Sequence, residues 1–159
     1  MNSRRTFLVL AAVSIVSHPI LARSLAASPG ITVTKDPNCG CCTAWADHLR
    51  ANGFAVTVVE DGQINRLKAK LGVPSALFSC HTAEVEGFVI EGHVPASAIR
   101  RLLEQRPSVR GLAVPGMPVG SPGMEVEGTP NDRYEVIAFG PSGQSVFARF
   151  EGKNELPAS

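Results

Sequence analysis

The sequence predicts a mixed α/β fold, a sheet flanked by helices in the order β-α-β-α-β-β-α. Short runs rich in β-branched residues alternate with segments whose apolar residues recur at helical spacing. Gly and Pro residues mark the ends of these segments. The last third of the chain loses the helical pattern, and it predicts a Gly/Pro/Met-rich loop followed by a C-terminal β-hairpin.

The first predicted strand and helix enclose a cysteine cluster. The β-branched run 31–34 predicts a short strand, which the turn at 36–38 ends. Three of the four cysteines follow within four residues: Cys39, Cys41 and Cys42. A helical pattern then runs from Thr43 to a stop at Gly53, so the cysteines stand where the strand meets the helix.

The next strand and helix are predicted from apolar content. Residues 54–59 are nearly all apolar, which predicts a strand in the centre of the sheet. A second helix opens at Asp61 or Gly62, with one stripe facing the core and the opposite side facing water. The predicted stripe is Ile64, Leu67 and Leu71, and the predicted water-facing residues are Arg66, Lys68 and Lys70.

A hairpin and a third helix complete the pattern. Residues 73–79 fit either a short helical turn or extended chain. Residues 80–85 and 88–90 predict a β-hairpin, and a third helix starts at Pro95 and stops at Pro107. This is the element order of the thioredoxin fold, with a cysteine cluster at the end of the first strand.

The remaining chain has a different composition. Residues 111–128 are rich in Gly and Pro and contain Met117 and Met124, which predicts a long loop laid over the domain. Residues 134–139 and 144–150 predict the terminal hairpin.

The first residues predict an export signal. The arginine pair Arg4-Arg5 precedes an apolar run and then several small residues, a layout typical of bacterial twin-arginine export. We expect residues 1–27 to be this signal, and the protein to reach the periplasm without a membrane span once it is processed. We expect residues 28–107 to form a thioredoxin-like metal-binding domain on which residues 108–159 pack.

Composition argues against one class of function. The 159-residue chain has a formal net charge of +1, no basic run, one Trp and one Tyr. Nucleic-acid binding needs clustered Lys and Arg or aromatic stacking platforms. We therefore expect no nucleic acid among the partners.

The cysteine spacing leaves several chemistries open. Structural disulfides are common in exported proteins, but a Cys41–Cys42 bridge is a strained ring and a Cys39–Cys42 bridge closes too small a loop to stabilise much. A long-range bridge to Cys80 leaves two thiols over. Cys39 and Cys42 have the C-x-x-C spacing of a redox dithiol at a helix N-terminus, which favours the thiolate that a metal also needs.

Cys80 favours metal binding over disulfide exchange. The third predicted strand runs antiparallel to the first, so Cys80 is expected to face the cluster across a short gap. Four converging sulfurs exceed the needs of a redox pair, and soft thiolates and thioethers select Cu(I). The cluster lacks the paired spacing usual in structural zinc sites. The predicted ligands are Cys39, Cys41, Cys42 and Cys80.

Other candidate ligands are treated one by one. His48 lies about 9 Å along the helix from Cys42, too far to share a metal ion with it. His81 points away from Cys80 on a regular strand, and it joins the site only if the strand is bulged or begins there. The sequence leaves ligation open for three more residues: His93, Met117 and Met124.

Several motifs resemble the DUF411 family, whose members include copper-resistance proteins. The matching segments are Cys39-Gly40-Cys41-Cys42, Leu71-Gly72-Val73-Pro74, Ser79-Cys80-His81-Thr82, Gly92-His93-Val94-Pro95, Gly111-Leu112-Ala113-Val114-Pro115-Gly116-Met117-Pro118 and Gly120-Ser121-Pro122-Gly123-Met124-Glu125. The resemblance covers about residues 31–150. It implies a thioredoxin-like, exported protein whose four cysteines bind copper, with a multinuclear thiolate cluster as one form of that binding.

The sequence thus predicts a periplasmic Cu(I)-binding protein that contributes to copper tolerance or copper redox handling. Its expected partners are copper ions and other periplasmic copper-handling proteins. Two alternatives stay open. One is a thiol–disulfide oxidoreductase with Cys39 as the nucleophile and Cys42 as the resolving thiol, and the other is a structural zinc module.

Overall fold

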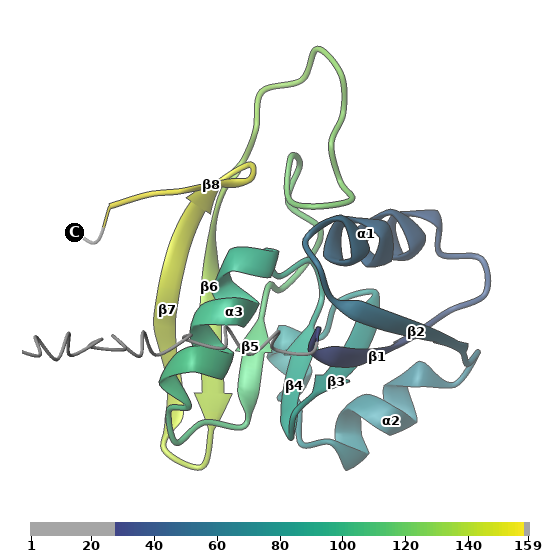
Figure 1. Cartoon of the computed structure of the whole chain (residues 1–159), viewed down its shortest axis with the longest axis vertical. Helices are drawn as coiled ribbons and strands as arrows, with labels where there is room; N and C mark the ends of the chain where they lie inside the picture. Colours follow the sequence, from purple (N-terminus) through teal and green to yellow (C-terminus); the bar gives the residue numbers. More distant parts are fainter. Residues whose placement is uncertain (1–27, 158–159) are drawn as a thin grey trace, which may run out of the picture.

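A single mixed sheet of eight strands runs through the part of the chain that the structure describes, residues 28–157 (Figure 1). The structure is a computed structural model, and the predicted export signal at 1–27 lies outside the described residues. The elements are β1 (Gly30–Lys35), α1 (Gly40–Ala51), β2 (Ala55–Glu60), α2 (Ile64–Lys70), the 3-10 helix η1 (Ser75–Leu77), β3 (His81–Val85), β4 (Phe88–Glu91), α3 (Ala96–Gln105), β5 (Gly111–Ala113), β6 (Arg133–Gly140), β7 (Gly143–Glu151) and β8 (Asn154–Glu155). None of the described helices is long and apolar enough to cross a lipid bilayer.

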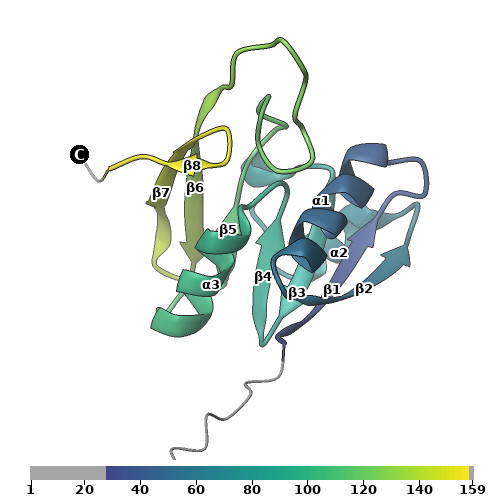
Figure 2. The same ribbon diagram turned by 45° about the horizontal axis from the view of Figure 1, so that its top comes forward.

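The first half of the sheet has the predicted element order. Strand β1 pairs in parallel with β2 and antiparallel with β3, and β3 forms a hairpin with β4. Helices α1 and α3 cover one face of the sheet, and α2 covers the other (Figure 2). The segment that fitted either a helical turn or extended chain contains the single-turn helix η1.

Alternate residues of the central strands supply two hydrophobic cores. Ile90 of β4 and Leu112 of β5 join the larger core, to which Trp45 of α1 also belongs. The next residue in each strand points the other way, so Val89 and Ala113 join the smaller core. The sheet is therefore apolar on both faces, as expected for strands covered by helices on both sides.

Strand β2 does not occupy the central position that its composition predicted. The sheet order is β2-β1-β3-β4-β5-β6-β7-β8, which makes β2 an edge strand. Most of its residues are exposed or half-buried, and Val59 is 44% exposed. A run of β-branched residues favours a strand, but its place in the sheet depends on what packs beside it.

Lys68 of α2 is buried, although helical spacing predicted that it faces water. Its side chain is 0% exposed, and its Nζ lies 2.5 Å from Oε1 of Glu91, which is also fully buried. Arg66 and Lys70 are exposed, as predicted. The stripe predicted to be buried is only half-buried: Ile64, Leu67 and Leu71. Spacing alone misplaced Lys68 because its burial depends on an acidic partner in β4, 23 residues further on.

A short strand occupies the start of the predicted Gly/Pro-rich loop. Strand β5 pairs in parallel with β4 and antiparallel with β6. A Cβ on Gly111 would lie 1.8 Å from the Val89 carbonyl oxygen, so the close strand approach needs a glycine there. The predicted terminal hairpin is confirmed as β6 and β7, and β5 joins it to the rest of the sheet.

Candidate metal centre

Three cysteines lie at the N-terminus of α1, which begins at Gly40 rather than at Thr43. Cys39 is the N-cap residue, and its backbone N–H donates to the Asp36 carbonyl over 3.0 Å. Cys41 and Cys42 follow in the first turn of the helix. Cys42 is fully buried, whereas Cys39 and Cys41 are half-buried.

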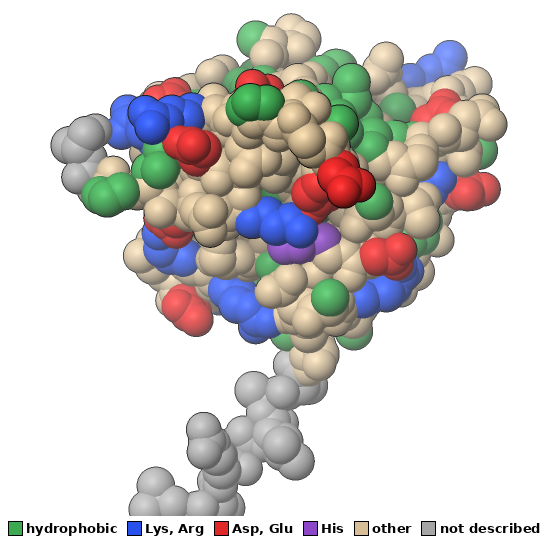
Figure 3. All heavy atoms as spheres, turned by 90° about the horizontal axis from the view of Figure 1, so that it is seen from above, with side chains coloured by type: hydrophobic (Ala, Val, Ile, Leu, Met, Phe, Trp, Pro, Cys, Tyr) green, Lys and Arg blue, Asp and Glu red, His purple; other side chains and the backbone are tan. Residues whose placement is uncertain are grey.

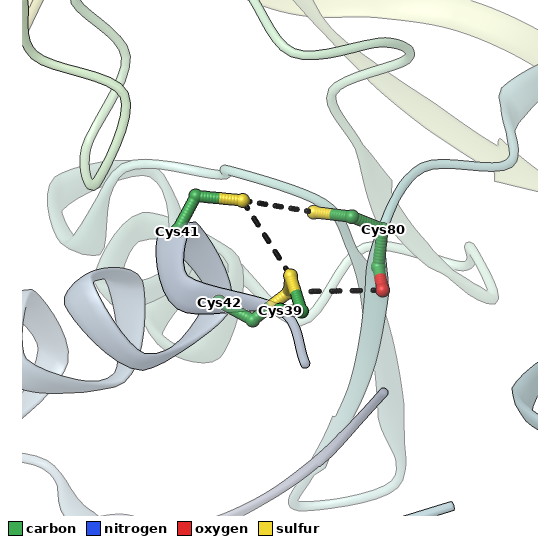
Figure 4. A group of neighbouring side chains, drawn as sticks. All are labelled: Cys39, Cys41, Cys42 and Cys80. Atoms are coloured by element: carbon green, nitrogen blue, oxygen red, sulfur yellow. Dashed lines mark hydrogen bonds between the residues drawn. A yellow bond between two sulfur atoms is a disulfide. The ribbon is translucent and has the colours of Figure 1, made fainter. Parts of the chain in front are cut away.

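The fourth cysteine faces these three, as the topology predicted. Strand pairing places Lys35 opposite His81, so Cys80 lies beside the turn that leads to the cluster. Cys41 Sγ lies 4.0 Å from Cys80 Sγ and 3.5 Å from Cys39 Sγ (Figure 4). The four cysteine sulfurs all lie within 4.8 Å of one another, which is close enough for them to hold a metal ion.

The structure contains a disulfide between Cys39 and Cys42, while Cys41 and Cys80 are free thiols. The S–S bond is drawn in yellow in Figure 4. Metal binding by all four sulfurs therefore needs the reduced form, because a disulfide sulfur carries no thiolate charge. The Cys39–Cys42 pair therefore has two possible roles: the reduced dithiol can bind a metal or donate two electrons, and the disulfide can accept two electrons.

Two imidazoles also reach Cys80. Its Sγ lies 3.3 Å from His81 Nδ1 and 3.1 Å from His93 Nε2, and the three residues form a second group able to hold a metal ion. Strand β3 begins at His81, so Cys80 precedes the regular strand and the alternation of side chains does not separate the two. This is the exception under which His81 was expected to join the site.

The hydrogen bonds of His93 fix its tautomer. Its Nδ1 lies 2.8 Å from the Pro122 carbonyl oxygen, which can only accept, so Nδ1 carries the proton and Nε2 presents a lone pair to Cys80. Burial lowers the pKa of His93. Burial also raises the pKa of Cys80 to about 12, with the Cys41 sulfur adding to the effect. The lowered pKa of His93 and the raised pKa of Cys80 both favour a neutral pair, in which the Cys80 thiol donates a hydrogen bond to His93 Nε2.

His81 is fully buried against aromatic surface. Its ring centroid lies 4.3 Å from that of Trp45, and burial lowers its pKa well below the ordinary value. Its Nε2 has no hydrogen-bond partner among the described residues. Trp45 is held in turn, because its indole N–H donates to the Val94 carbonyl over 2.9 Å.

His48 lies outside the cluster, as its helical distance from Cys42 predicted. Its Nε2 accepts a hydrogen bond from the Ala96 N–H at 3.2 Å. It lines a cleft of about 680 Å³ together with Glu125 and Lys153, and the mixed charges of this face are visible from above (Figure 3). Burial lowers its pKa, the charge of Lys153 adds to that effect, and Glu125 opposes it.

A small hollow connects Cys80 with solvent. It measures about 250 Å³ and is lined by Phe78, Ser79, Cys80, Gly116 and Met117. Met117 is 53% exposed, so its thioether borders the hollow without being packed into the core. Met124 is half-buried, and its carbonyl accepts the Gly120 N–H within the same loop.

Comparison with known proteins gives the family. Two solved structures of copper resistance protein CopG, form 2 and form 1, are 47% and 48% identical to this sequence, with TM-scores of 0.73 and 0.72. Each alignment covers 77% of this chain and 98% of the other. The family model described as protein of unknown function, DUF411, matches residues 77–124. The chain belongs to the DUF411 family. No curated protein matches the sequence.

The family match coincides with one part of the site. The matched segment contains Cys80, both imidazoles that contact it, and the loop carbonyl that holds His93. The donor set, thiolates with neutral imidazoles, suits Cu(I), Cu(II) or Zn²⁺ better than hard cations, which prefer oxygen. The structure brings together the four cysteines that the sequence predicted as ligands. The sequence left His93 undecided, because its contact with Cys80 spans 13 residues and its contact with Pro122 spans 29.

Proposed function

We propose that the protein is a copper-binding protein that holds Cu(I) through Cys39, Cys41, Cys42 and Cys80 and contributes to copper tolerance. The observation that carries this proposal is the convergence of the four sulfurs within 4.8 Å of one another. The similarity to copper resistance protein CopG over most of the chain supports the same metal.

Cu(I) is the oxidation state that suits this donor set. It is a soft ion, and thiolate is the softest ligand available in a protein. Four thiolates around fewer than four Cu(I) ions carry net negative charge, which is costly in a half-buried site. Bridging sulfurs and several copper ions per chain reduce that charge. His93 Nε2, already turned toward Cys80, is a further donor within reach.

The setting of the site is part of the proposal. The β-α-β-α-β-β-α order of the first half of the sheet supports a thioredoxin-like assignment for residues 28–107. Residues 108–159 continue the same sheet, which supports one domain rather than two. A periplasmic location and periplasmic copper-handling partners rest on the export signal predicted for residues 1–27.

A second candidate function is copper or thiol redox chemistry, which the Cys39–Cys42 disulfide favours. In the copper version, two Cu(II) ions each take one electron from the dithiolate of Cys39 and Cys42. Two Cu(I) ions and one disulfide result, and a reductant must later restore the dithiol. In the protein-substrate version, Cys39 attacks a substrate disulfide and Cys42 resolves the mixed disulfide.

The deciding experiment is an anaerobic Cu(I) titration of the reduced chain without its predicted signal, beside Cys80→Ser. We expect more than one copper per chain in the wild type. We expect Cys80→Ser to lose more affinity than the about 10- to 100-fold that outer-shell changes cost. The measurements are metal quantification and competition with a Cu(I) chelator.

Each alternative has a distinct outcome. A ratio of one copper or less in a monomer rejects the multinuclear form. An insulin-reductase activity that survives Cys80→Ser supports thiol–disulfide exchange. Zinc that co-purifies and whose chelation unfolds the chain supports a structural zinc module.

A further inference from the structure

A buried polar cluster lies on the α2 face of the sheet. Lys68 and Glu91 are both 0% exposed, and Lys68 Nζ lies 2.5 Å from Glu91 Oε1. Lys68 Nζ also donates to Thr82 Oγ1 at 2.9 Å, and the Thr82 hydroxyl donates to Glu91 Oε2 at 2.6 Å. Lysine and glutamate are almost never fully buried without a partner, so the three side chains form one closed unit.

Stability alone does not account for this unit. Moving two charges out of water is costly, and their attraction only roughly repays that cost. Replacing such a pair with apolar residues of similar volume is often neutral or stabilising. The pair is therefore better explained by something that one of its members holds in place.

Glu91 holds the backbone of Ser79. The Ser79 N–H donates to Glu91 Oε1 over 2.6 Å. Ser79 lies between η1 and β3, outside regular secondary structure. Its side chain is held as well, because its hydroxyl donates to the Gly116 carbonyl over 2.6 Å. Gly92, with φ of +71°, packs so closely that a Cβ there would lie 2.6 Å from Ser79 Oγ.

Ser79 precedes the cysteine on which the candidate metal centre converges. Cys80 belongs to both groups of possible metal ligands. The other three cysteines are positioned by α1, whereas Cys80 lies in neither a helix nor a strand. Glu91 and Thr82 lie on the α2 face, while His81 packs against Trp45 of α1, so the backbone at 79–81 connects the two faces.

We infer that Glu91, held by Lys68 and Thr82, is a positioning residue that fixes Cys80 through the Ser79 N–H. The inference rests on the proposed function for its meaning, since an aligned Cys80 serves copper binding. Glu91 touches no sulfur, and it acts through the peptide unit that precedes Cys80.

Two double variants separate the charge from the acceptor. Both Lys68→Met/Glu91→Gln and Lys68→Met/Glu91→Leu remove the ion pair. Only the first keeps a side-chain oxygen that can accept the Ser79 N–H, with its amide N–H donating to Thr82. We expect the Gln variant to bind Cu(I) as the wild type does. We expect the Leu variant to lose about tenfold in Cu(I) affinity, the cost of one hydrogen bond to a buried group.

A copper-free measurement reads the position of Cys80 directly. In a Cys39→Ser/Cys42→Ser background, only Cys41 and Cys80 remain, and a glutathione redox buffer reports how readily they form a disulfide. We expect the effective concentration of this pair to fall about tenfold in the Leu variant and to stay unchanged in the Gln variant. A Cu(I)–thiolate absorption spectrum altered only in the Leu variant is the matching signature in loaded protein.

The outcomes are decisive in both directions. Equal behaviour of the two variants in the thiol assay overturns the inference. A Leu variant that fails to fold while the Gln variant folds also overturns it, because the acceptor then serves the fold and not Cys80. If the wild type binds no copper but the thiol assay separates the variants, the proposed function fails and the positioning role stands.

Discussion

The two halves of the sheet contribute differently to the candidate metal centre. The half from β1 to α3 supplies every cysteine and both imidazoles of the cluster. The half from β5 to β8 and its long loop supply backbone carbonyls instead. The Pro122 carbonyl accepts from His93, and the Gly116 carbonyl accepts from Ser79.

The first half of the sheet thus supplies the candidate metal ligands, here called donors. The second half supplies groups that hold those ligands in place, here called supports. The side chains proposed to hold a metal come from the N-terminus of α1 and the start of β3. Short spacing brings three of the cysteines together, and the pairing of β1 with β3 brings Cys80 beside them. Carbonyls of the loop then orient those side chains by fixing a proton or a backbone, as outer-shell groups do at metal sites. The loop packs closely against α1 at Gly123, where an added Cβ would lie 2.7 Å from the Trp45 backbone nitrogen.

The largest expected effect comes from disrupting that contact. Gly123→Ala places a Cβ 2.8 Å from the Cys41 carbonyl and forces alanine to a φ of +85°. We expect a loss of about 2–5 kcal/mol in the free energy of unfolding, from the backbone and overpacking costs together. Urea denaturation of the copper-free protein measures it.

Gly128→Ala is the matched control for this prediction. Gly128 also has a positive φ, of +75°, but nothing lies within 4 Å of its added Cβ. We expect it to cost only the backbone share, about 1–2 kcal/mol. Equal losses for the two variants would show that the loop does not press on α1.

A smaller effect tests whether His93 is a donor, a supported residue, or both. His93→Asn keeps a side-chain N–H near the position of Nδ1, so it can still donate to Pro122, but it lacks Nε2. We expect the fold to persist and the Cu(I) affinity to fall about tenfold or more, measured by chelator competition.

His93→Gln provides the opposite change. Its amide reaches toward Cys80 but no longer occupies the Nδ1 position, so the Pro122 carbonyl loses its donor. We expect a loss of about 1–3 kcal/mol in unfolding free energy. If the Asn variant were the less stable and the Gln variant the weaker binder, the division between donors and supports would be wrong.

The pH dependence of stability tests the contact around His48. The pKa of His48 is lowered in the folded protein. Below about pH 6.5, His48 is therefore protonated to a greater extent in the unfolded chain than in the folded chain. We expect the unfolding free energy of the copper-free protein to fall as the pH drops from 7 to 5. His81 and His93 add to the same trend, because their pKa values are lowered too.

His48→Gln isolates one contribution to that trend. Its side-chain oxygen can still accept the Ala96 N–H, but it does not titrate. We expect a shallower decline between pH 7 and 5, measured by urea denaturation at each pH. An unchanged slope would mean that His48 titrates alike in the folded and unfolded chains.

The smallest effect concerns the exposed methionine. Met117 borders the hollow that reaches Cys80, and Met124 lies further along the same loop. We expect Met117→Ala to slow Cu(I) uptake, with a change in affinity below the about tenfold expected for a lost imidazole. Met124→Ala serves as the control in stopped-flow uptake. Equal rates in both variants would remove the thioether from the path of the ion.

Local patterns predicted the elements that depend on neighbouring residues. Both hairpins, the three helices and the strand before the cysteines follow from periodicity and from Gly and Pro. The features that local patterns missed or misplaced include the edge position of β2, the strand β5, the burial of Lys68 and the start of α1 at Gly40. Strand β5 has only three residues, so no period can reveal it.

By itself, the sequence determined the chemistry available to this protein. Four cysteines, three of them within four residues, already favour a soft metal or a disulfide, because these are the reactions that closely spaced thiols undergo. The antiparallel pairing of β1 and β3 extended that argument to Cys80.

Only the tertiary structure decided which groups surround those sulfurs. The contact of His93 with Cys80, the Glu91 bond to Ser79 and the loop contact at Gly123 join residues 13, 12 and about 80 positions apart. Such contacts depend on how the strands are ordered and on which faces are covered. A local sequence pattern carries no information about strand order or about which faces are covered. The cysteine cluster could therefore be predicted from the sequence, whereas the contacts that hold it in place could not.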